Sequence, residues 1–281
     1  MGGGMARNLI AAGYSVSVCD LDPVKVADLV ERGAVEQATP AETVAASSIT
    51  IVSLPTSGTF IRVAEADNGL LAGMSEGRIV IDVGTTSAPE TRRLAKSFTE
   101  RGGHLVDAPV SGGGRGADAG TLAVMVGGED DAVEKCWDVL NVAGDNVVHL
   151  GPTGSGQLGK AVNQIALGVA DAACLEAMLI GVKGGLDPEK IWKVLSTAVG
   201  RNNRVFEKNA KAVAAGTARN QDCKLRELPY FIEEARAQGY TLPMTEAFES
   251  FCRDSEKSIT DPLGIPTASY WDELTTRKRE E

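Results

Sequence analysis

Hydrophobic positions divide the chain into two parts with different periods. Up to about Gly151, short runs rich in β-branched residues alternate with stretches of helical period. This alternation is typical of a parallel sheet covered by helices, so we predict a Rossmann-type α/β domain over residues 1–152. The runs expected to form its strands are SVSVCD, SITIVSLP, RIVIDVG, GHLVDAPV, TLAVMVGG and NVVHLGP.

The strand signal stops after Gly154, and at least three helical segments follow, among them one near residues 156–184. We therefore predict an all-α second domain over residues 153–281. Its most apolar stretch, residues 162–182, contains Asp171 and Glu176. Because charged side chains are costly inside a bilayer, this stretch is interpreted as a buried helix and no membrane partner is expected.

The excess of acidic over basic residues limits the kinds of partner that the protein can bind. A formal net charge of −10 disfavours nucleic acid and anionic membranes, because both bind basic surfaces. An anionic substrate must then be held by local groups. The five cysteines show no C-x-x-C pair, so neither a disulfide framework nor a metal site is expected. Together with an N-terminus unlike a signal peptide, this favours the cytoplasm or an organelle matrix.

The first residues match the second half of a βαβ unit. Gly2, Gly3 and Gly4 lead into a helical stretch that ends at Gly13, and an alternating strand then runs to Asp20. A dinucleotide-binding fold normally places an apolar strand and further glycines before this point. We therefore expect Gly2 to contribute to the phosphate-binding turn, and the first strand of the sheet to be missing.

Asp20 is the candidate ligand of the adenosine ribose. It lies 18 residues after Gly2, close to the interval of about 20 residues at which an acid binds the ribose hydroxyls. Its charge favours NAD, with NADP as the alternative, because a 2′-phosphate would be repelled. Asp20 could instead merely start a turn, although Asp22 before Pro23 already supplies a helix N-cap.

Two further loops follow apolar strands and should lie at the carboxyl edge of the sheet, where nucleotides bind. One contains Leu54 and Pro55, and the other contains Thr85, whose hydroxyl could bind a cofactor. Serine and threonine are also common at such ends for purely local reasons, so that alternative stays open.

A third loop combines a hydroxyl with glycines. Residues 107–114, DAPVSGGG, place Ser111, Gly112 and Gly113 directly after a strand. Successive exposed N–H groups can bind a carboxylate without a net positive charge, which suits an acidic protein. A mobile glycine loop with no ligand is the alternative.

The helix near residues 156–184 carries the candidate proton donor. Ser155 is a plausible N-cap, and Lys160, Asn163 and Gln164 follow at positions i, i+3 and i+4 of one helix face. Reduction of a carbonyl requires a proton at the developing alkoxide, which a lysine of lowered pKa can supply. Burial must lower that pKa from about 10.4 to about 7 or 8. The alternative is an ordinary exposed lysine.

With these segments in place, the chain resembles the β-hydroxyacid dehydrogenase family over nearly its whole length. The motifs that carry the resemblance are GGGMARNL from Gly2, DAPVSGG from Asp107, and the run from Gly151 that leads to Lys160 and Asn163. The resemblance implies that Lys160 is the general acid/base and that a substrate carboxylate is bound by Ser111, Gly112, Gly113 and Asn163. It implies cofactor binding by Asp20, Leu54, Pro55 and Thr85. Gln164 stands where some relatives carry asparagine, which favours the tartronate semialdehyde group over the 3-hydroxyisobutyrate group.

Two departures from the family pattern matter. The opening motif is entered at Met1, so the chain is expected to be N-terminally truncated. Arg226-Glu227 replaces a Lys-Asp pair, which puts an arginine where a lysine would approach the cofactor. The resemblance implies an oxidoreductase for a small β-hydroxy acid or its semialdehyde that forms a homodimer or homotetramer. A nucleotide sensor or a cofactor-incompetent chain is the alternative; imine reduction is disfavoured by Lys160 and the Ser-Gly-Gly loop.

Overall fold

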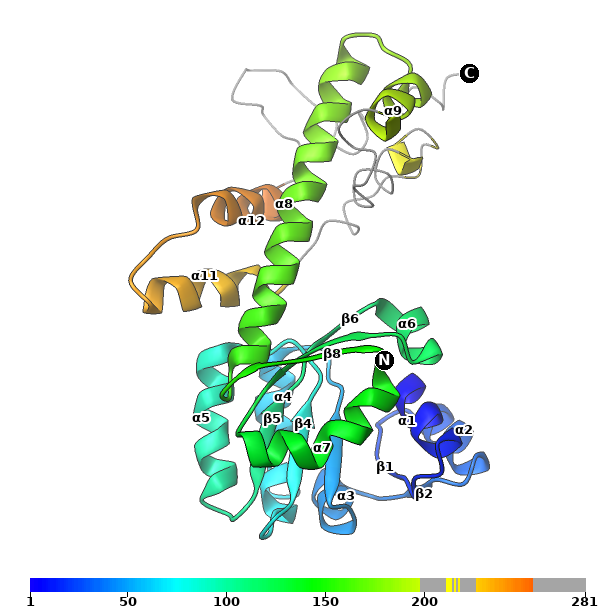
Figure 1. The fold of residues 1–281 in the computed structure, drawn as a ribbon, viewed down its shortest axis with the longest axis vertical. Helices are drawn as coiled ribbons and strands as arrows, with labels where there is room; N and C mark the ends of the chain where they lie inside the picture. Colours follow the sequence, from blue (N-terminus) through cyan, green and yellow to red (C-terminus); the bar gives the residue numbers. More distant parts are fainter. Residues whose placement is uncertain (198–210, 214, 216, 218–225, 255–281) are drawn as a thin grey trace. The chain divides into compact units, whose positions relative to one another are not determined.

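The computed structural model describes residues 1–197, 211–213, 215, 217 and 226–254. By the contacts among its residues, the chain divides into two compact units, Met1–Ala161 and Val162–Glu281. The boundary between these units falls within one long helix, α8 (Ser155–Lys183) (Figure 1). The division at residues 152 and 153 that the sequence suggests stays a prediction.

The first unit alternates strands with helices. The first elements of the chain are α1 (Gly2–Ala11), β1 (Ser17–Val18), α2 (Pro23–Glu31), β2 (Val35–Glu36) and α3 (Pro40–Ala46). The remaining elements before α8 are β3 (Ile49–Val52), α4 (Ser57–Glu65), the short 3₁₀ helix η1 (Leu70–Gly73), β4 (Ile79–Asp82), α5 (Ala88–Thr99), β5 (His104–Asp107), β6 (Val110–Ser111), α6 (Gly113–Ala119), β7 (Ala123–Gly127), α7 (Asp130–Ala143) and β8 (Asn146–Gly151).

The main sheet has six strands in the order β3-β4-β5-β7-β6, with β8 paired to β7. Strands β3, β4 and β5 are parallel, and their registers place Val52 beside Asp82 and Asp82 beside Asp107. Strand β7 runs antiparallel to β5 and β6. The predicted α/β domain with a parallel sheet is confirmed, and the far edge of that sheet is mixed.

Helices cover both faces of this sheet because successive strand residues point to opposite sides. In β4, Ile79 and Ile81 join a buried cluster with α7. Val80, between them, joins a second cluster with α4 and α5, which includes Phe60 and Leu94. The result is a three-layer unit whose strand ends are free to carry loops (Figure 1).

Strands β1 and β2 form a separate two-stranded parallel sheet. β1 is shorter than the predicted strand from Tyr14 to Asp20, and β2 is its only strand partner among the described residues. A cavity of about 540 Å³ is lined by residues of β1 and by Ile49–Ile51 of β3. The cavity therefore lies between β1 and β3.

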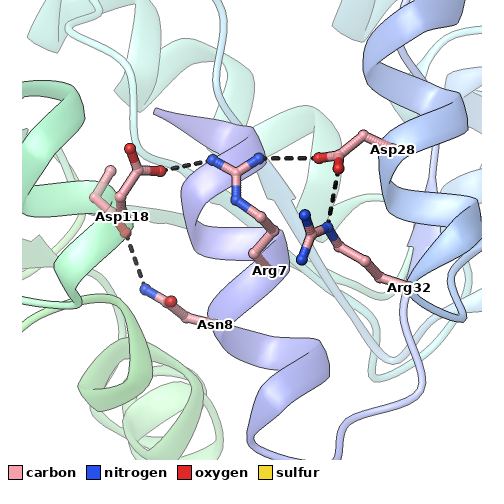
Figure 2. Close-up of polar contacts among 6 residues, drawn as sticks. Arg7, Asn8, Asp28, Arg32 and Asp118 are labelled. Carbon is pink, nitrogen blue, oxygen red and sulfur yellow. Dashed lines mark hydrogen bonds and ion pairs between the residues drawn. The ribbon is translucent and has the colours of Figure 1, made fainter.

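Helix α1 is fixed between α2 and α6 by polar contacts (Figure 2). Arg7 donates to Asp28 of α2 at 3.1 Å and to Asp118 of α6 at 2.6 Å. Asn8 Nδ2 donates to the main-chain oxygen of Ala117 at 2.9 Å. Each exposed ion pair contributes little alone, but together these bonds hold α6, which begins at Gly113, the last residue of the Ser111–Gly113 loop.

The described part of the second unit is helical. It contains the C-terminal part of α8, followed by α9 (Pro188–Thr197), α11 (Leu228–Ala237) and α12 (Pro243–Asp254). Ile191, Phe231, Ile232 and Phe248 are among its buried apolar side chains. The predicted change from an α/β part to a helical part is confirmed.

Candidate active site

The start of α8 is held by the carboxylate of Asp107 at the end of β5. Asp107 Oδ1 accepts a hydrogen bond from Gly154 N at 2.7 Å, and Oδ2 accepts one from Gln157 N at 2.9 Å. A carboxylate in this position binds N–H groups that have no partner within the helix. Ser155, suggested by the sequence as the N-cap, is instead the first helical residue. The cap comes from a residue far away in the sequence.

Two glycines allow α8 to approach the sheet closely. A Cβ atom on Gly127 would lie 2.6 Å from Gly156 N and 2.7 Å from Asp107 Oδ1. A Cβ atom on Gly156 would overlap the main-chain oxygen of Met125. The first turn of α8 is therefore packed main chain against main chain on the ends of β5 and β7.

Lys160 lies in the second turn of α8 and is buried, with 7% of its surface exposed. Its Nζ donates a hydrogen bond to the main-chain oxygen of Val110 at 2.7 Å. The alternative of an ordinary exposed lysine is thus wrong. Because Val110 directly precedes Ser111, the ammonium group lies beside the loop predicted to bind substrate.

That loop has the backbone geometry that only glycine adopts readily. Gly112 has φ 135° and Gly113 has φ 67°, and both are exposed, while Ser111 is half-buried. A Cβ atom on Gly112 would lie 2.9 Å from Leu122 Cδ2, whereas a Cβ atom on Gly113 would have no heavy atom within 4 Å. The loop therefore presents main chain rather than side chains next to Lys160.

A second loop, Gly84–Thr86, is fixed at the end of β4 by Asp82. Asp82 accepts hydrogen bonds from Gly84 N at 2.9 Å and from the Thr86 hydroxyl at 2.6 Å. Gln157 of α8 reaches the same loop: its Oε1 accepts from Thr86 N at 3.0 Å and its Nε2 donates to Gly84 O at 3.1 Å. Thr85, the predicted cofactor ligand, lies between the two main-chain groups that Gln157 binds.

Burial raises the pKa of both strand-end carboxyls. The pKa of Asp82 rises to about 7, mainly through desolvation, while hydrogen bonds from Thr86 and Gly84 act in the opposite direction. The pKa of Asp107 rises to about 6 for the same main reason, opposed by N–H donors that include Gly154 and Gln157. Perturbed carboxyls at strand ends are typical of functional sites, although buried structural networks also produce them.

Leu54 and Thr85 lie on neighbouring loops at the carboxyl ends of β3 and β4. A Cβ atom on Gly84 would be 3.2 Å from the main-chain oxygen of Leu54, so the two loops are in contact. Leu54 and Thr85 are half-buried and Pro55 is exposed. The structure thus brings these three predicted cofactor residues to one edge of the sheet.

Gly2 and Asp20 lie further along the same edge. A Cβ atom on Gly2 would be 3.1 Å from Ser53 Cβ, so the start of α1 adjoins the β3 loop and has no side chain there. Both residues line the cavity between β1 and β3. Asp20 is exposed and accepts a bond from Asp22 N at 2.9 Å, while Asp22 caps α2, as predicted. The bare helix start and the nearby acid fit the phosphate and ribose of a dinucleotide.

The other predicted ligands belong to the second unit. Asn163 and Gln164 are half-buried on α8, and Asn163 Nδ2 donates to Gln164 Oε1 at 3.4 Å. Arg226 is exposed in the turn before α11, while Lys224 and Leu225 lie outside the described residues.

Sequence reasoning missed Asp82, Thr86 and Gln157 as parts of this network, and it gave Asp107 no role of its own. The available signal was positional, because Asp82 and Asp107 each end an apolar strand. A buried acid at that position is costly unless it binds nearby N–H or hydroxyl groups. Gln157 gave no comparable signal.

Two family models match the chain. The first, the NAD binding domain of 6-phosphogluconate dehydrogenase, matches residues 1–151. The second, described as NAD-binding of NADP-dependent 3-hydroxyisobutyrate dehydrogenase, matches residues 154–262. Among the described residues, no helix is both long and apolar enough to cross a membrane.

Curated and solved relatives agree with these matches. The chain is 36% identical over 248 residues to 2-(hydroxymethyl)glutarate dehydrogenase of Eubacterium barkeri, covering 87% of this chain and 82% of that protein. It is 40% identical over 203 residues to 3-hydroxyisobutyrate dehydrogenase of Pseudomonas aeruginosa, covering 72% and 68%. Its fold matches the structure of Mycobacterium tuberculosis 3-hydroxyisobutyrate dehydrogenase with L-serine, with a TM-score of 0.79, 26% identity and coverage of 99% and 96%.

The family models, the relatives and the fold define an NAD(P)-dependent oxidoreductase with an α/β part and a helical part. Its relatives span most of its length at well over 30% identity. The chain belongs to the β-hydroxyacid dehydrogenase family.

Proposed function

We propose that this chain transfers a hydride between NAD(P) and a small β-hydroxy acid or its semialdehyde, with Lys160 as the general acid/base. The observation that carries the proposal is the burial of Lys160 with its Nζ at 2.7 Å from Val110 O, next to the Ser111–Gly113 loop. An amine in this position can exchange a proton with a substrate whose carboxylate is bound by that loop. The named activities of the relatives support this substrate class.

Each candidate residue then has a separate task. The Ser111 hydroxyl and the N–H groups of Gly112 and Gly113 bind the carboxylate, assisted by the amides of Asn163 and Gln164. Lys160 gives a proton to the substrate oxygen during reduction and removes it during oxidation. The nicotinamide cofactor, when bound, supplies or accepts the hydride.

The residues proposed for the cofactor lie mostly along one sheet edge. Leu54, Pro55 and Thr85 would contact the nicotinamide half, with Arg226 of the second unit, while Gly2 would adjoin the phosphates and Asp20 the ribose. The first family model ends at residue 151 and the second begins at residue 154, which supports the proposed domain boundary between residues 152 and 153.

Lys160→Met tests the proton transfer. Small 3-hydroxy acids and semialdehydes would be screened with NAD and NADP against the unchanged chain and the variant. We expect kcat to fall about 10²- to 10⁴-fold while the melting temperature and NAD affinity change little. Lys96→Met, at an exposed position of α5, is the control. Equal turnover in Lys160→Met would exclude this role, and NAD binding without turnover in the unchanged chain would favour a nucleotide sensor.

Asp20→Asn tests the choice of cofactor. Removal of the negative charge should lower kcat/KM with NAD and raise it with NADP, so that the NAD/NADP ratio falls about tenfold, equivalent to ~1.4 kcal/mol. Asp67→Asn is the matched exposed control. An unchanged ratio would mean that Asp20 only fixes the turn before α2.

Homo-oligomerisation through the helical unit is also proposed. Val162, Ile180, Leu186 and Val194 are large apolar side chains that are more than half exposed there. Light scattering should show a dimer or tetramer, and Ile180→Lys should shift it toward the monomer; a monomeric unchanged chain would contradict the proposal. Cys136 is buried and forms no disulfide, which supports the proposal of a reducing compartment such as the cytoplasm or an organelle matrix.

A further inference from the structure

Gln157 is a buried amide that joins two functional segments of the first unit. Only 2% of its surface is exposed. Its side chain uses both ends, because Oε1 accepts from Thr86 N at 3.0 Å and Nε2 donates to Gly84 O at 3.1 Å. An amide is the side-chain group that can accept and donate in this way without a charge.

The two segments that Gln157 joins have different proposed tasks. Gly84 and Thr86 flank Thr85, which lies on the cofactor loop. Gln157 itself lies in the first turn of α8, three residues before Lys160, and residues at this spacing share one helix face. The side chain thus bonds the cofactor loop directly to the helix that carries the proton donor.

The main chain at Gln157 is fixed independently. Its N–H donates to Asp107 Oδ2 at 2.9 Å, and the neighbouring Gly156 is packed against Met125 and Asp107. Since the first turn of α8 is immobilised on β5, the side chain of Gln157 extends this fixed point to the Gly84–Thr86 loop. The first turn of α8 and the Gly84–Thr86 loop are therefore both fixed to the same part of the sheet.

We propose that Gln157 is a positioning residue that holds the Thr85 loop at a fixed position relative to Lys160. Hydride transfer and proton transfer then take place with the reacting groups in a constant arrangement. The proposal rests on the function proposed above. A displacement of about 1 Å between reacting groups can lower a rate by about a hundredfold, which makes such a bridge consequential.

Gln157→Met tests this role, because methionine has a similar length but forms neither hydrogen bond. On a substrate found by the screen, kcat should fall about 10- to 100-fold while the Kd for NAD stays within about threefold. The deuterium isotope effect on hydride transfer should increase, since the chemical step becomes slower than product release. Thr91→Val is the control, because it removes another buried hydrogen bond, Thr91 Oγ1 to Ser87 O, that does not involve α8.

Amide hydrogen exchange tests the bridge without any turnover. In Gln157→Met, exchange at the Thr86 amide should accelerate at least tenfold, because its acceptor Oε1 is lost, while exchange at the Leu158 amide of α8 should change little, because Asp107 still fixes the first turn; in Thr91→Val neither amide should exchange faster. Unchanged exchange at Thr86 would show that the Gln157 amide does not hold the Gly84–Thr86 loop, and would overturn the proposal. An unchanged kcat and isotope effect in an active enzyme would also overturn it. Absence of turnover in the unchanged chain would instead refute the proposed function and leave the exchange result decisive.

Discussion

Asp82 and Asp107 are neighbours in the sheet but bind different kinds of donor. They are paired in register at the ends of β4 and β5, and both are fully buried. One oxygen of Asp82 binds a hydroxyl, which can also accept a hydrogen bond, whereas both oxygens of Asp107 bind main-chain N–H groups, which cannot. The same substitution should therefore have unequal effects at the two positions.

Asp107→Asn is expected to destabilise the protein by about 1 to 3 kcal/mol, because the new NH₂ group would face a main-chain N–H. In Asp82→Asn the NH₂ group can donate to the Thr86 hydroxyl, so the loss should stay below ~1 kcal/mol. Urea unfolding of both variants measures the difference. Equal destabilisation would contradict these hydrogen-bond assignments.

The same pair predicts a pH dependence of stability. Folding raises the pKa of Asp82 from 3.8 to about 7 and that of Asp107 from 3.8 to about 6. The folded chain therefore keeps protons that the unfolded chain releases, so the free energy of unfolding should fall as the pH rises from about 4 to about 7. The slope is at most about 1.4 kcal/mol per pH unit for each carboxyl. Asp82→Asn should flatten the upper part of the curve; a variant curve parallel to that of the unchanged chain would refute the assignment.

At the scale of elements, the contact between α1 and α6 depends on a single glycine. A Cβ atom on Gly4 would lie 2.7 Å from Asp118 Oδ1 and 2.9 Å from the carbonyl carbon of Ala117. At Gly3, one position earlier, the nearest atom would be 3.6 Å away, in the flexible side chain of Arg7. Two adjacent glycines of one helix thus have different reasons to be there.

Gly4→Ala should destabilise the protein by about 1 to 3 kcal/mol, because α6 must move away from α1. Gly3→Ala should instead be neutral or stabilise by up to about 1 kcal/mol through helix propensity. Thermal unfolding of both variants gives the comparison. Similar melting temperatures would mean that α6 adapts without cost, although Arg7 and Asn8 bind it through the contacts drawn in Figure 2.

The sequence predicted the helices and strands better than it predicted the long-range contacts at their ends. The start of α8 was found to within a residue, because glycines and a long helical period mark it, but its cap was assigned to Ser155. The actual acceptor, Asp107, is brought there by the sheet, and no local pattern encodes such a pairing. For the same reason the sequence pointed to Lys160 and the Ser111 loop through motifs, yet gave no indication of Gln157, whose partners depend on tertiary structure.

At the scale of the whole molecule, the first unit has cores of very different size. The cluster between the main sheet and α7 contains sixteen buried residues, whereas the cluster beneath β1 and β2 contains four, Val18, Val26, Leu29 and Ala34. Local stability follows the amount of buried apolar surface, so the two sheets should open at different free energies.

Hydrogen exchange without cofactor should show this difference. The amides of Val35 and Gln37, which bind Val16 O and Val18 O between β1 and β2, should exchange faster than those of Val83 and Ala108 in the main sheet. Added NAD should slow Val35 and Gln37 selectively. Uniform protection across all four amides would show that the first unit opens as one cooperative body.

The small core beneath β1 and β2 then affects how cofactor binding responds to heat. Asp20 follows β1, so the proposed ribose contact is available only while the small sheet is closed. An apparent dissociation constant increases as the fraction of competent molecules falls. Moderate warming would therefore weaken cofactor affinity well before the main sheet melts, and saturation with NAD would extend the working temperature of the enzyme.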